Sequence, residues 1–296
     1  MSSLEMAELL LLAALWGGSF LFMRIAAPAL GPIWLIEFRV LLAGLALLPL
    51  LVRFNLWYEV RRNWISLLIV GCINSAIPFS LLAFAAVSLP AGFTSILNAT
   101  APLFGTIVAF VWLKEKLTVT RMIGCSLGFI GVVILMGWKA VELTPTFVMA
   151  VSAGLLAALT YAIAAPYIKQ KLTGVPSLAI TAGSQLGAAI LLLPALPFTT
   201  PQQPITQEIV LAVLGLALLS TAFAYLLYFR LIQNIGATTA LTVTYLIPLF
   251  AMLWGTLFLN ETITGTMILG CGLILLGTAI ANDLLTKALG DRTKHK

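Results

Sequence analysis

Two prolines, Pro102 and Pro248, lie in nearly repeated stretches, APLFGTIVAFVWLKEKLT (101–118) and IPLFAMLWGTLFLNETIT (247–264). Each stretch belongs to a long apolar run, which predicts a helix. A proline inside a helix cannot donate a backbone hydrogen bond and displaces the carbonyl four residues earlier. The displaced carbonyls are those of Asn98 and Thr244, and Pro78 has the same effect on Asn74. We expect these carbonyls to accept hydrogen bonds from a small molecule and the prolines to form kinks or hinges. The alternative is that the prolines only bend helices for packing.

Polar and aromatic side chains inside the same apolar runs could complete such a site. Unpaired polar groups that face lipid are costly, so some of these side chains must face an interior. A cavity with aromatic walls and a few hydrogen-bonding groups suits a small amphipathic molecule. Packing between helices is the alternative for each residue taken singly. The predicted cavity residues are Trp16, Asn74, Asn98, Thr100, Tyr161, Tyr225, Thr244 and Tyr245.

Charged side chains inside the apolar runs are scarce, and each is a functional hypothesis by default. Glu37 and Arg39 lie two residues apart, so on a helix they point to different faces and form a poor pair. Arg24 is an alternative partner for Glu37. We expect these three residues to form an outer gate or to take part in proton coupling, with a structural ion pair as the alternative. Glu115 and Glu261 are expected to belong to turns, each followed by a threonine that can cap the next helix.

No cluster typical of catalysis or metal binding occurs in the sequence. The only histidine is His295, and Cys72, Cys125 and Cys271 show no CxxC or Cys/His spacing. Membrane enzymes usually need acid, base or metal-binding groups together, so we predict no catalytic residue, no metal, no cofactor and no enzyme. The sequence also has no GxxxxGK[ST] loop for ATP.

The elements that must position these residues are membrane helices. The chain has 296 residues, of which 61% are hydrophobic and 9% charged, and a mean hydropathy of +1.10. That is too apolar for a water-soluble globule. Apolar runs of about 20 residues cross a hydrocarbon core as helices. We predict ten, at 6–26, 33–52, 64–87, 92–113, 119–138, 146–168, 178–197, 208–232, 237–259 and 264–285.

The second half of the chain repeats the first at an offset of 146 positions. Pro102 falls on Pro248, Glu115 on Glu261, and Gly124 on Gly270. Each half then holds five helices, and because five is odd the second half enters the membrane the other way up. The predicted fold is an all-α integral membrane protein of ten transmembrane helices in two inverted five-helix repeats (5+5). The repeats cover 1–140 and 141–286, and a basic tail follows at 287–296.

Closely spaced glycines in the predicted fifth and tenth helices allow close packing of membrane helices. We expect them to join the two halves, with a homodimer as the alternative. They are Gly124, Gly128, Gly131, Gly270, Gly272 and Gly277.

Basic residues differ between the two copies of the repeated motif. Lys114, Lys116 and Arg121 become Asn260, Thr262 and Met267 in the second copy. Basic residues favour the cytoplasmic side of short loops, so we predict that both termini are cytoplasmic. The inner segments then hold 13 of the 16 basic residues, namely Arg53, Arg61, Arg62, Lys114, Lys116, Arg121, Lys169, Lys171, Arg230, Lys287, Arg292, Lys294 and Lys296. This bias accounts for the net charge of +6 without a nucleic-acid partner.

The whole chain resembles the EamA-type permeases of the drug/metabolite transporter superfamily. The resemblance is carried by the small pair after Trp16, by Phe38 and Arg39, and by the twice-used pattern P-L-F…L-x-E-x-[LI]-T followed by G-C. It implies a permease of the bacterial inner membrane, with a central cavity lined by helices 1, 3, 4, 6, 8 and 9. Because the sequence has no ATP-binding loop, we expect a secondary carrier or facilitator. Its partners would be membrane lipid and a small-molecule substrate, such as an amino acid or related metabolite moved outward by alternating access. Multidrug efflux is the alternative, and a non-transporting structural protein a remote one. The small multidrug pumps of the superfamily carry a glutamate in helix 1, which AALWGGSF lacks.

Overall fold

The computed structural model describes residues 2–136 and 144–282, which form helices without strands. The predicted basic tail at 287–296 lies outside the described residues. The α-helices are α1 Ser3–Leu30, α2 Pro32–Arg53, α3 Trp57–Arg62, α4 Trp64–Gly71, α5 Ile77–Ser88, α6 Ala91–Asn98, α7 Ala101–Trp112, α8 Val119–Met136, α9 Pro145–Lys171, α10 Ser177–Leu192, α11 Gln207–Leu214, α12 Ala224–Ile235, α13 Ala237–Ala240, α14 Val243–Leu259 and α15 Gly265–Ala281. Two π-helical segments, η1 Cys72–Ala76 and η3 Gly215–Phe223, and the 3-10 segment η2 Leu193–Phe198 continue neighbouring helices.

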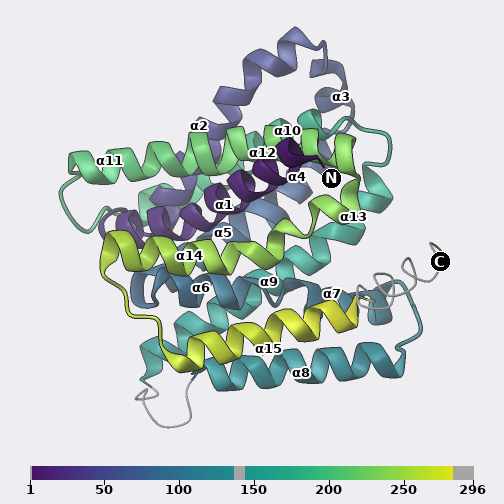
Figure 1. Cartoon of the computed structure of the whole chain (residues 1–296). Helices are drawn as coiled ribbons and strands as arrows, with labels where there is room; N and C mark the ends of the chain where they lie inside the picture. Colours follow the sequence, from purple (N-terminus) through teal and green to yellow (C-terminus); the bar gives the residue numbers. More distant parts are fainter. Residues whose placement is uncertain (1, 137–143, 283–296) are drawn as a thin grey trace.

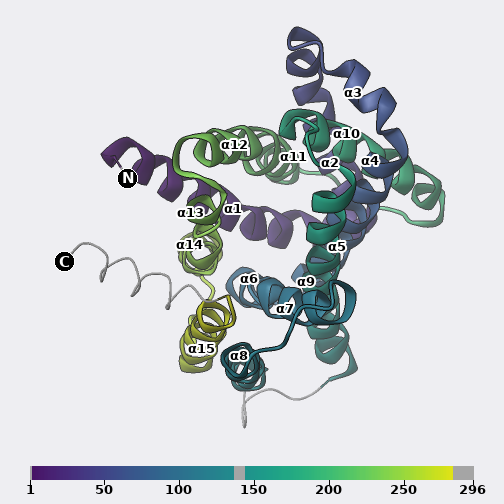
Figure 2. The ribbon, with the colours of Figure 1, turned by 90° about the vertical axis from the view of Figure 1, so that its right-hand side faces the viewer.

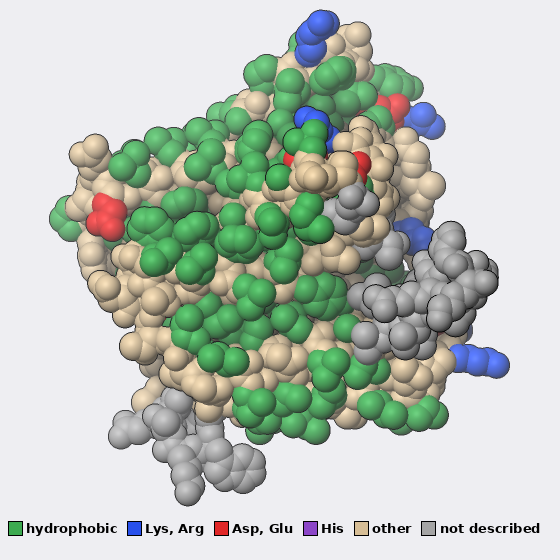
Figure 3. All heavy atoms as spheres, in the orientation of Figure 1, with side chains coloured by type: hydrophobic (Ala, Val, Ile, Leu, Met, Phe, Trp, Pro, Cys, Tyr) green, Lys and Arg blue, Asp and Glu red, His purple; other side chains and the backbone are tan. Residues whose placement is uncertain are grey.

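Within the described residues, eight helices are long and apolar enough to cross a membrane. They are Ser3–Leu30, Pro32–Arg53, Trp64–Ser88, Ala91–Trp112, Val119–Met136, Pro145–Lys171, Ser177–Phe198 and Gln207–Ile235. The shorter apolar helices α14 and α15 occupy the positions of the predicted ninth and tenth spans. Many large apolar side chains are exposed, and Figure 3 shows them across one face with charged side chains mostly toward its ends. These are the features of a multi-pass membrane protein.

Several of the long spans are interrupted near their middle. A π-helical segment precedes α5 and another precedes α12, and the α6–α7 span breaks at Ala99 and Thr100. Single π-helical turns inside α-helices frequently occur at functional sites, because the wider turn leaves carbonyls and side chains out of the regular pattern. The interruptions of these spans therefore indicate a candidate functional site in the interior of the bundle.

The helices run roughly side by side, and α1 begins at the same end of the bundle at which α15 finishes (Figure 1). Viewed from that end, α8 and α15 form a pair at one edge, away from α2 and α10 (Figure 2). Close approach at glycines makes this pairing tight. A Cβ added at Gly124 would lie 2.5 Å from the Ala281 nitrogen, and one at Gly131 would lie 2.9 Å from the Gly270 oxygen. The prediction that these glycines join the two halves is confirmed, whereas Gly272 has no such neighbour within 4 Å.

Other helix pairs also join the two halves of the chain. Gly17 of α1 packs against Phe250 of α14, and Gly44 of α2 packs against Leu186 of α10. In the same way α9 lies against α6 and α7, where Gly154 contacts Leu97. Helices of the first half therefore pack directly against helices of the second half. These close helix–helix contacts surround the space between the two halves.

Candidate functional site

A cavity of about 530 Å³ lies inside the bundle. Such a volume is typical of small-molecule sites. Its wall is mainly apolar and aromatic, and it extends from mid-helix residues toward Ile168 near the end of α9 and Leu241 before α14. Most of the residues predicted to line a cavity lie on this wall: Trp16, Asn74, Asn98, Tyr161, Tyr225, Thr244 and Tyr245, together with Arg39, Pro102 and Pro248.

Thr100 does not lie on the wall of the cavity. Its side chain is fully buried, and its hydroxyl donates to the Leu97 carbonyl over 2.6 Å. A threonine hydroxyl often bonds back to a carbonyl three or four residues earlier. The prediction that Thr100 lines the cavity is therefore wrong, because the local turn uses its polar group.

One of the three prolines differs from what its spacing in the sequence predicted. Pro102 lies in the first turn of α7, after the break at 99–100. A helix does not need a donor N–H in its first turn, so the predicted interior position of Pro102 is wrong. Pro78 follows the π-helical segment η1 inside the continuous helix Trp64–Ser88, and Pro248 lies inside α14, so these two interior positions are confirmed. The hinge role of the three prolines remains a prediction.

Aromatic rings from both halves of the chain face one another around the cavity. The Trp16 ring lies 5.1 Å from that of Tyr228 and 6.1 Å from that of Tyr225, measured between centroids. Phe79 and Tyr161 make a similar edge contact at 6.3 Å. Tyr225 of α12 and Asn74 of η1 both lie on the cavity wall. These contacts are in the usual range for aromatic pairs, and they hold a rigid apolar wall with a few polar tips.

Arg39 is buried at this wall, with 5% of its surface exposed. Its Nε donates to Thr221 Oγ1 over 3.0 Å, and its guanidinium lies 3.5 Å from the centroid of the Phe79 ring. Glu37, two residues away, is 2% exposed and does not line the cavity. Both of its carboxylate oxygens are buried without a hydrogen-bond partner among the described residues. The sequence was right that Glu37 and Arg39 point to different faces.

A second hydrogen bond reproduces the one made by Arg39. Gln185 lies 146 positions after Arg39, and Thr221 lies 146 positions after Ser75. Gln185 Nε2 donates to Ser75 Oγ over 3.2 Å, as Arg39 donates to Thr221. Equivalent residues of the two halves therefore make equivalent bonds, although one donor is charged and the other is neutral.

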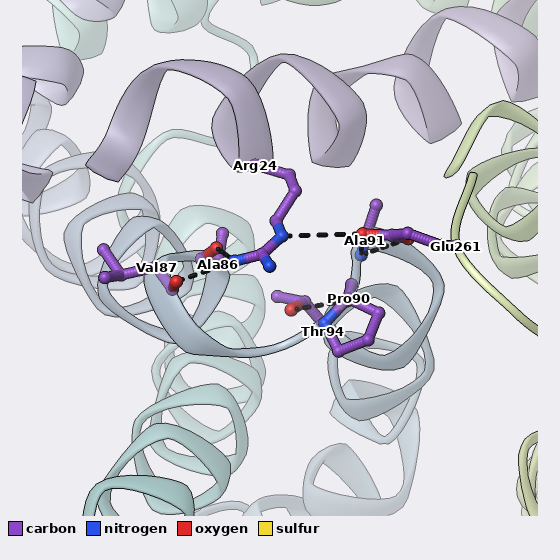
Figure 4. Close-up of polar contacts among 7 residues, drawn as sticks. All are labelled: Arg24, Ala86, Val87, Pro90, Ala91, Thr94 and Glu261. Atoms are coloured by element: carbon purple, nitrogen blue, oxygen red, sulfur yellow. Dashed lines mark hydrogen bonds and ion pairs between the residues drawn. The ribbon is translucent and has the colours of Figure 1, made fainter. Parts of the chain in front are cut away.

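Arg24 belongs to a polar network at the end of the bundle opposite the start of α1 (Figure 4). Its Nη1 donates to the carbonyls of Ala86 and Val87 over 2.9 and 2.7 Å, and its Nε lies 3.5 Å from Glu261 Oε1. The Glu261 carboxylate accepts the Ala91 N–H over 3.1 and 2.9 Å. The prediction that Arg24 pairs with Glu37 is wrong, because Glu261 arrives on the α14–α15 turn.

We call this set the Arg24–Glu261 network. It joins the end of α1, the end of α5, the start of α6 and the turn before α15. The first N–H groups of a helix have no partner within the helix, and a carboxylate there is stabilised by the helix dipole. Glu261 therefore acts as a cap for α6 supplied from the other half of the chain.

The turns that carry the two repeated glutamates share one backbone geometry. Lys114 and Asn260 both adopt a positive φ, 54° and 52°. The N–H of the following glutamate donates to the carbonyl of Ala109 in one copy and of Gly255 in the other. The threonine caps expected after these turns are confirmed, at Thr118 and Thr264. Unlike Glu261, Glu115 is exposed and pairs with Arg121 over 2.9 Å.

Comparison with known proteins matches the EamA-like transporter family over residues 5–137 and again over 148–282. The chain belongs to this family. The chain is 24% identical to "Uncharacterized transporter YoaV" of Bacillus subtilis, covering 89% of this chain and 91% of the relative. Against "Protein PecM" of Dickeya dadantii it is 26% identical, with 91% and 89% covered. A solved structure titled "Crystal structure of protein" aligns over 96% of this chain and 98% of its own, with a TM-score of 0.65 and 19% identity, which shows a shared fold.

As a member of the EamA-like family, the protein is a membrane transporter of small molecules and not an enzyme. Its structure also adds wall residues that the sequence did not single out. Ser95 and Thr278 lie on the wall, and their hydroxyl oxygens are buried without a partner in the described chain. Ser95 precedes Asn98 by three residues and so shares its helix face, a signal that was available in the sequence. Thr278 had no such signal, because its place depends on how α15 packs.

Proposed function

We propose that this EamA-family protein is a secondary carrier that moves small amphipathic metabolites, such as amino acids or related compounds, outward across the bacterial inner membrane. The observation that carries the proposal is the cavity, which equivalent positions of both halves line. Asn98 and Thr244 lie 146 positions apart, as do Pro102 and Pro248, and all four line the cavity. Secondary transporters commonly place their substrate site at the interface of two structural repeats near the membrane midplane.

The proposed architecture is two inverted repeats of five helices. Helices α1 and α14 run in the same direction, since Leu9 packs with Val243 at one end and Arg24 meets Glu261 at the other. Helices α8 and α15 run in opposite directions, since Gly124 meets Ala281 and Gly131 meets Gly270. These directions, the paired hydrogen bonds of Arg39 and Gln185, and the matched turns at Lys114 and Asn260 support the proposal.

Alternating access is the proposed mechanism, by rocking of one half against the other. The cavity extends toward the end of the bundle where α1 begins, whereas the Arg24–Glu261 network connects four segments at the opposite end. We assign the first end to the cytoplasm, because Arg53, Lys169 and Arg230 lie at helix ends on that side and basic residues favour the cytoplasm. The structure then corresponds to a state closed toward the outside.

Counterflow in proteoliposomes tests the proposal, because exchange is observed even when the coupling ion is unknown. Liposomes containing the purified protein would be loaded with unlabelled amino acids, and uptake of the labelled solute would be measured beside neutral and cationic dyes. Stimulated uptake of amino acids alone is the expected result. Uptake of dyes alone would replace the proposal with multidrug efflux, and no exchange of any solute would contradict transport of these classes.

A further inference from the structure

Arg39 is the one charged side chain among the described residues that line the cavity. A charge buried within a membrane protein is costly unless it is paired and hydrogen-bonded. The nearest acid in sequence, Glu37, lies off the wall, and no carboxylate of the described chain lies within the 4.0 Å of an ion pair with Arg39. The cavity therefore has a positive charge that the described part of the protein does not neutralise.

The contacts of Arg39 leave part of its guanidinium group available. A guanidinium has five N–H donors. Nε binds Thr221, and Nη1 makes a long contact of 3.9 Å with the sulfur of Met23. The face of the group packs on Phe79. These neighbours fix the orientation of the guanidinium plane, and they leave hydrogens on both terminal nitrogens without an acceptor among the described residues.

The equivalent position in the other half shows that this site does not need a charge for packing. Gln185 occupies that position and binds Ser75 as Arg39 binds Thr221. A neutral amide thus suffices for the hydrogen bond between helices. The positive charge is present in one half of the chain and absent from the equivalent position in the other half. Such an asymmetric site suits a ligand that has a negative group at one end.

We propose that Arg39 binds the carboxylate of the substrate, so that the carrier selects small organic carboxylates with an apolar body over amines and cationic drugs. This inference rests on the proposed transport function and names its substrate class. A guanidinium binds a carboxylate through two parallel hydrogen bonds. One positive charge balances one carboxylate, whereas a phosphate monoester carries about −1.5 to −2 at pH 7 and would leave negative charge uncompensated.

The remainder of the wall suits the rest of such a molecule. Trp16, Phe20 and Tyr161 provide apolar surface for an aliphatic or aromatic body. Asn98 Oδ1 and the hydroxyl oxygens of Ser95 and Thr278 are buried without partners among the described residues. These oxygens can accept hydrogen bonds from an ammonium group or a hydroxyl. Amino acids and simple carboxylic acids therefore share the feature that Arg39 recognises, and the test separates them.

Four matched probes test the assignment by isothermal titration with the full-length protein in nanodiscs. L-Phenylalanine and 3-phenylpropanoate carry the carboxylate, whereas phenethylamine and L-phenylalaninamide lack it. We expect both acids to bind at least about tenfold more tightly than either amine. Tighter binding of phenylalanine than of phenylpropanoate would identify amino acids as the preferred source of the carboxylate, and the reverse order would identify simple acids.

Arg39→Gln should weaken acid binding by about 10- to 100-fold, the range for loss of a charged hydrogen-bond partner. Arg39→Lys keeps the positive charge but lacks the planar guanidinium that binds a carboxylate through two hydrogen bonds, so it should retain the preference for acids at lower affinity. This variant replaces Arg39→Gln in the test if Arg39→Gln does not fold. Gln185→Leu is the matched control. It removes the equivalent neutral hydrogen bond, and the acid preference should not change.

Three results would overturn the assignment: amines that bind as tightly as acids, unchanged acid affinity in folded Arg39→Gln, or no binding of either acid. Counterflow with the same probes separates this inference from the transport function. If the acids bind but show no counterflow, the result supports carboxylate binding by Arg39 and contradicts transport through this site. Counterflow of the amines alone keeps transport and overturns the role of Arg39.

Discussion

Glu261→Ala should loosen the end of the bundle that the Arg24–Glu261 network joins. The substitution removes both oxygens that accept the Ala91 N–H at the start of α6, and it removes the ion pair with Arg24 at 3.5 Å. Loss of a helix cap typically costs about 1 kcal/mol. The ion pair is partly exposed, with 31% of the Arg24 side chain and 15% of that of Glu261 accessible, so it adds at most about 1 kcal/mol.

The expected loss is therefore about 1 to 2 kcal/mol, which corresponds to about a 5- to 30-fold change in the equilibrium between the joined and separated states. Hydrogen exchange at single-residue resolution measures this change at the Ala91 amide. In the wild type this amide should be protected although it is the first in its helix, because its acceptor comes from another part of the chain. The variant should lose protection by the stated factor.

Glu115→Ala is the matched control for this experiment. Glu115 occupies the same place in the repeated motif but is exposed and paired with Arg121, so its removal should leave exchange at Ala91 unchanged. An unprotected Ala91 amide in the wild type would refute the reasoning. So would equal exchange at Ala91 in the wild type and Glu261→Ala.

Three further predictions address packing, the cavity and pH. Gly124→Ala should lower the free energy of unfolding by about 1 to 3 kcal/mol, because its Cβ would lie 2.5 Å from the Ala281 nitrogen. Thermal unfolding in detergent should show this loss, with Gly272→Ala as a near-neutral control; equal midpoints would contradict the packing. Asn98→Ala and Tyr225→Ala should each reduce counterflow about tenfold at wild-type levels of folded protein, as expected for a lost hydrogen bond of about 1.4 kcal/mol, and unchanged flux in both would remove them from the site. Burial raises the pKa of Glu261 above its ordinary 4.5, against the opposing effects of the Ala91 N–H and Arg24. The network then binds a proton more tightly than a solvated glutamate does, so its stability should be greatest below about pH 4.5 and fall as the pH rises through the raised pKa. Ala91 protection, corrected for intrinsic exchange rates, should be higher at pH 5 than at pH 8; the opposite order would contradict this.

Hydrophobicity and repetition in the sequence were enough to predict the class and the elements. A helix in lipid must satisfy its own backbone groups, so apolar runs of about 20 residues identify spans almost without reference to tertiary contacts. The packing role of the glycines in α8 and α15 could also be predicted, because close approach of membrane helices needs small residues at regular spacing. The repeat offset then predicted which residues of the two halves are equivalent, and the bonds made by Arg39 and Gln185 agree with it.

The partners of the charged residues could be found only in the tertiary structure. Arg24 and Glu261 are far apart in the chain and meet because α1 and α14 run side by side. The sequence suggested Glu37 for Arg24, since proximity along the chain was the available guide.

Helix breaks and wall positions likewise depended on packing. The break at Ala99 and Thr100 places Pro102 at a helix start, a shift that intrinsic propensity did not predict. Thr278 reaches the cavity because α15 is held against α8, where two glycine surfaces meet. The sequence alone determined that this chain is a helical membrane protein with a duplicated plan, because hydrophobic length and repetition are local properties. Which polar groups meet across the interior was decided by the tertiary structure, because each such contact joins segments whose approach is set by the packing of the whole bundle.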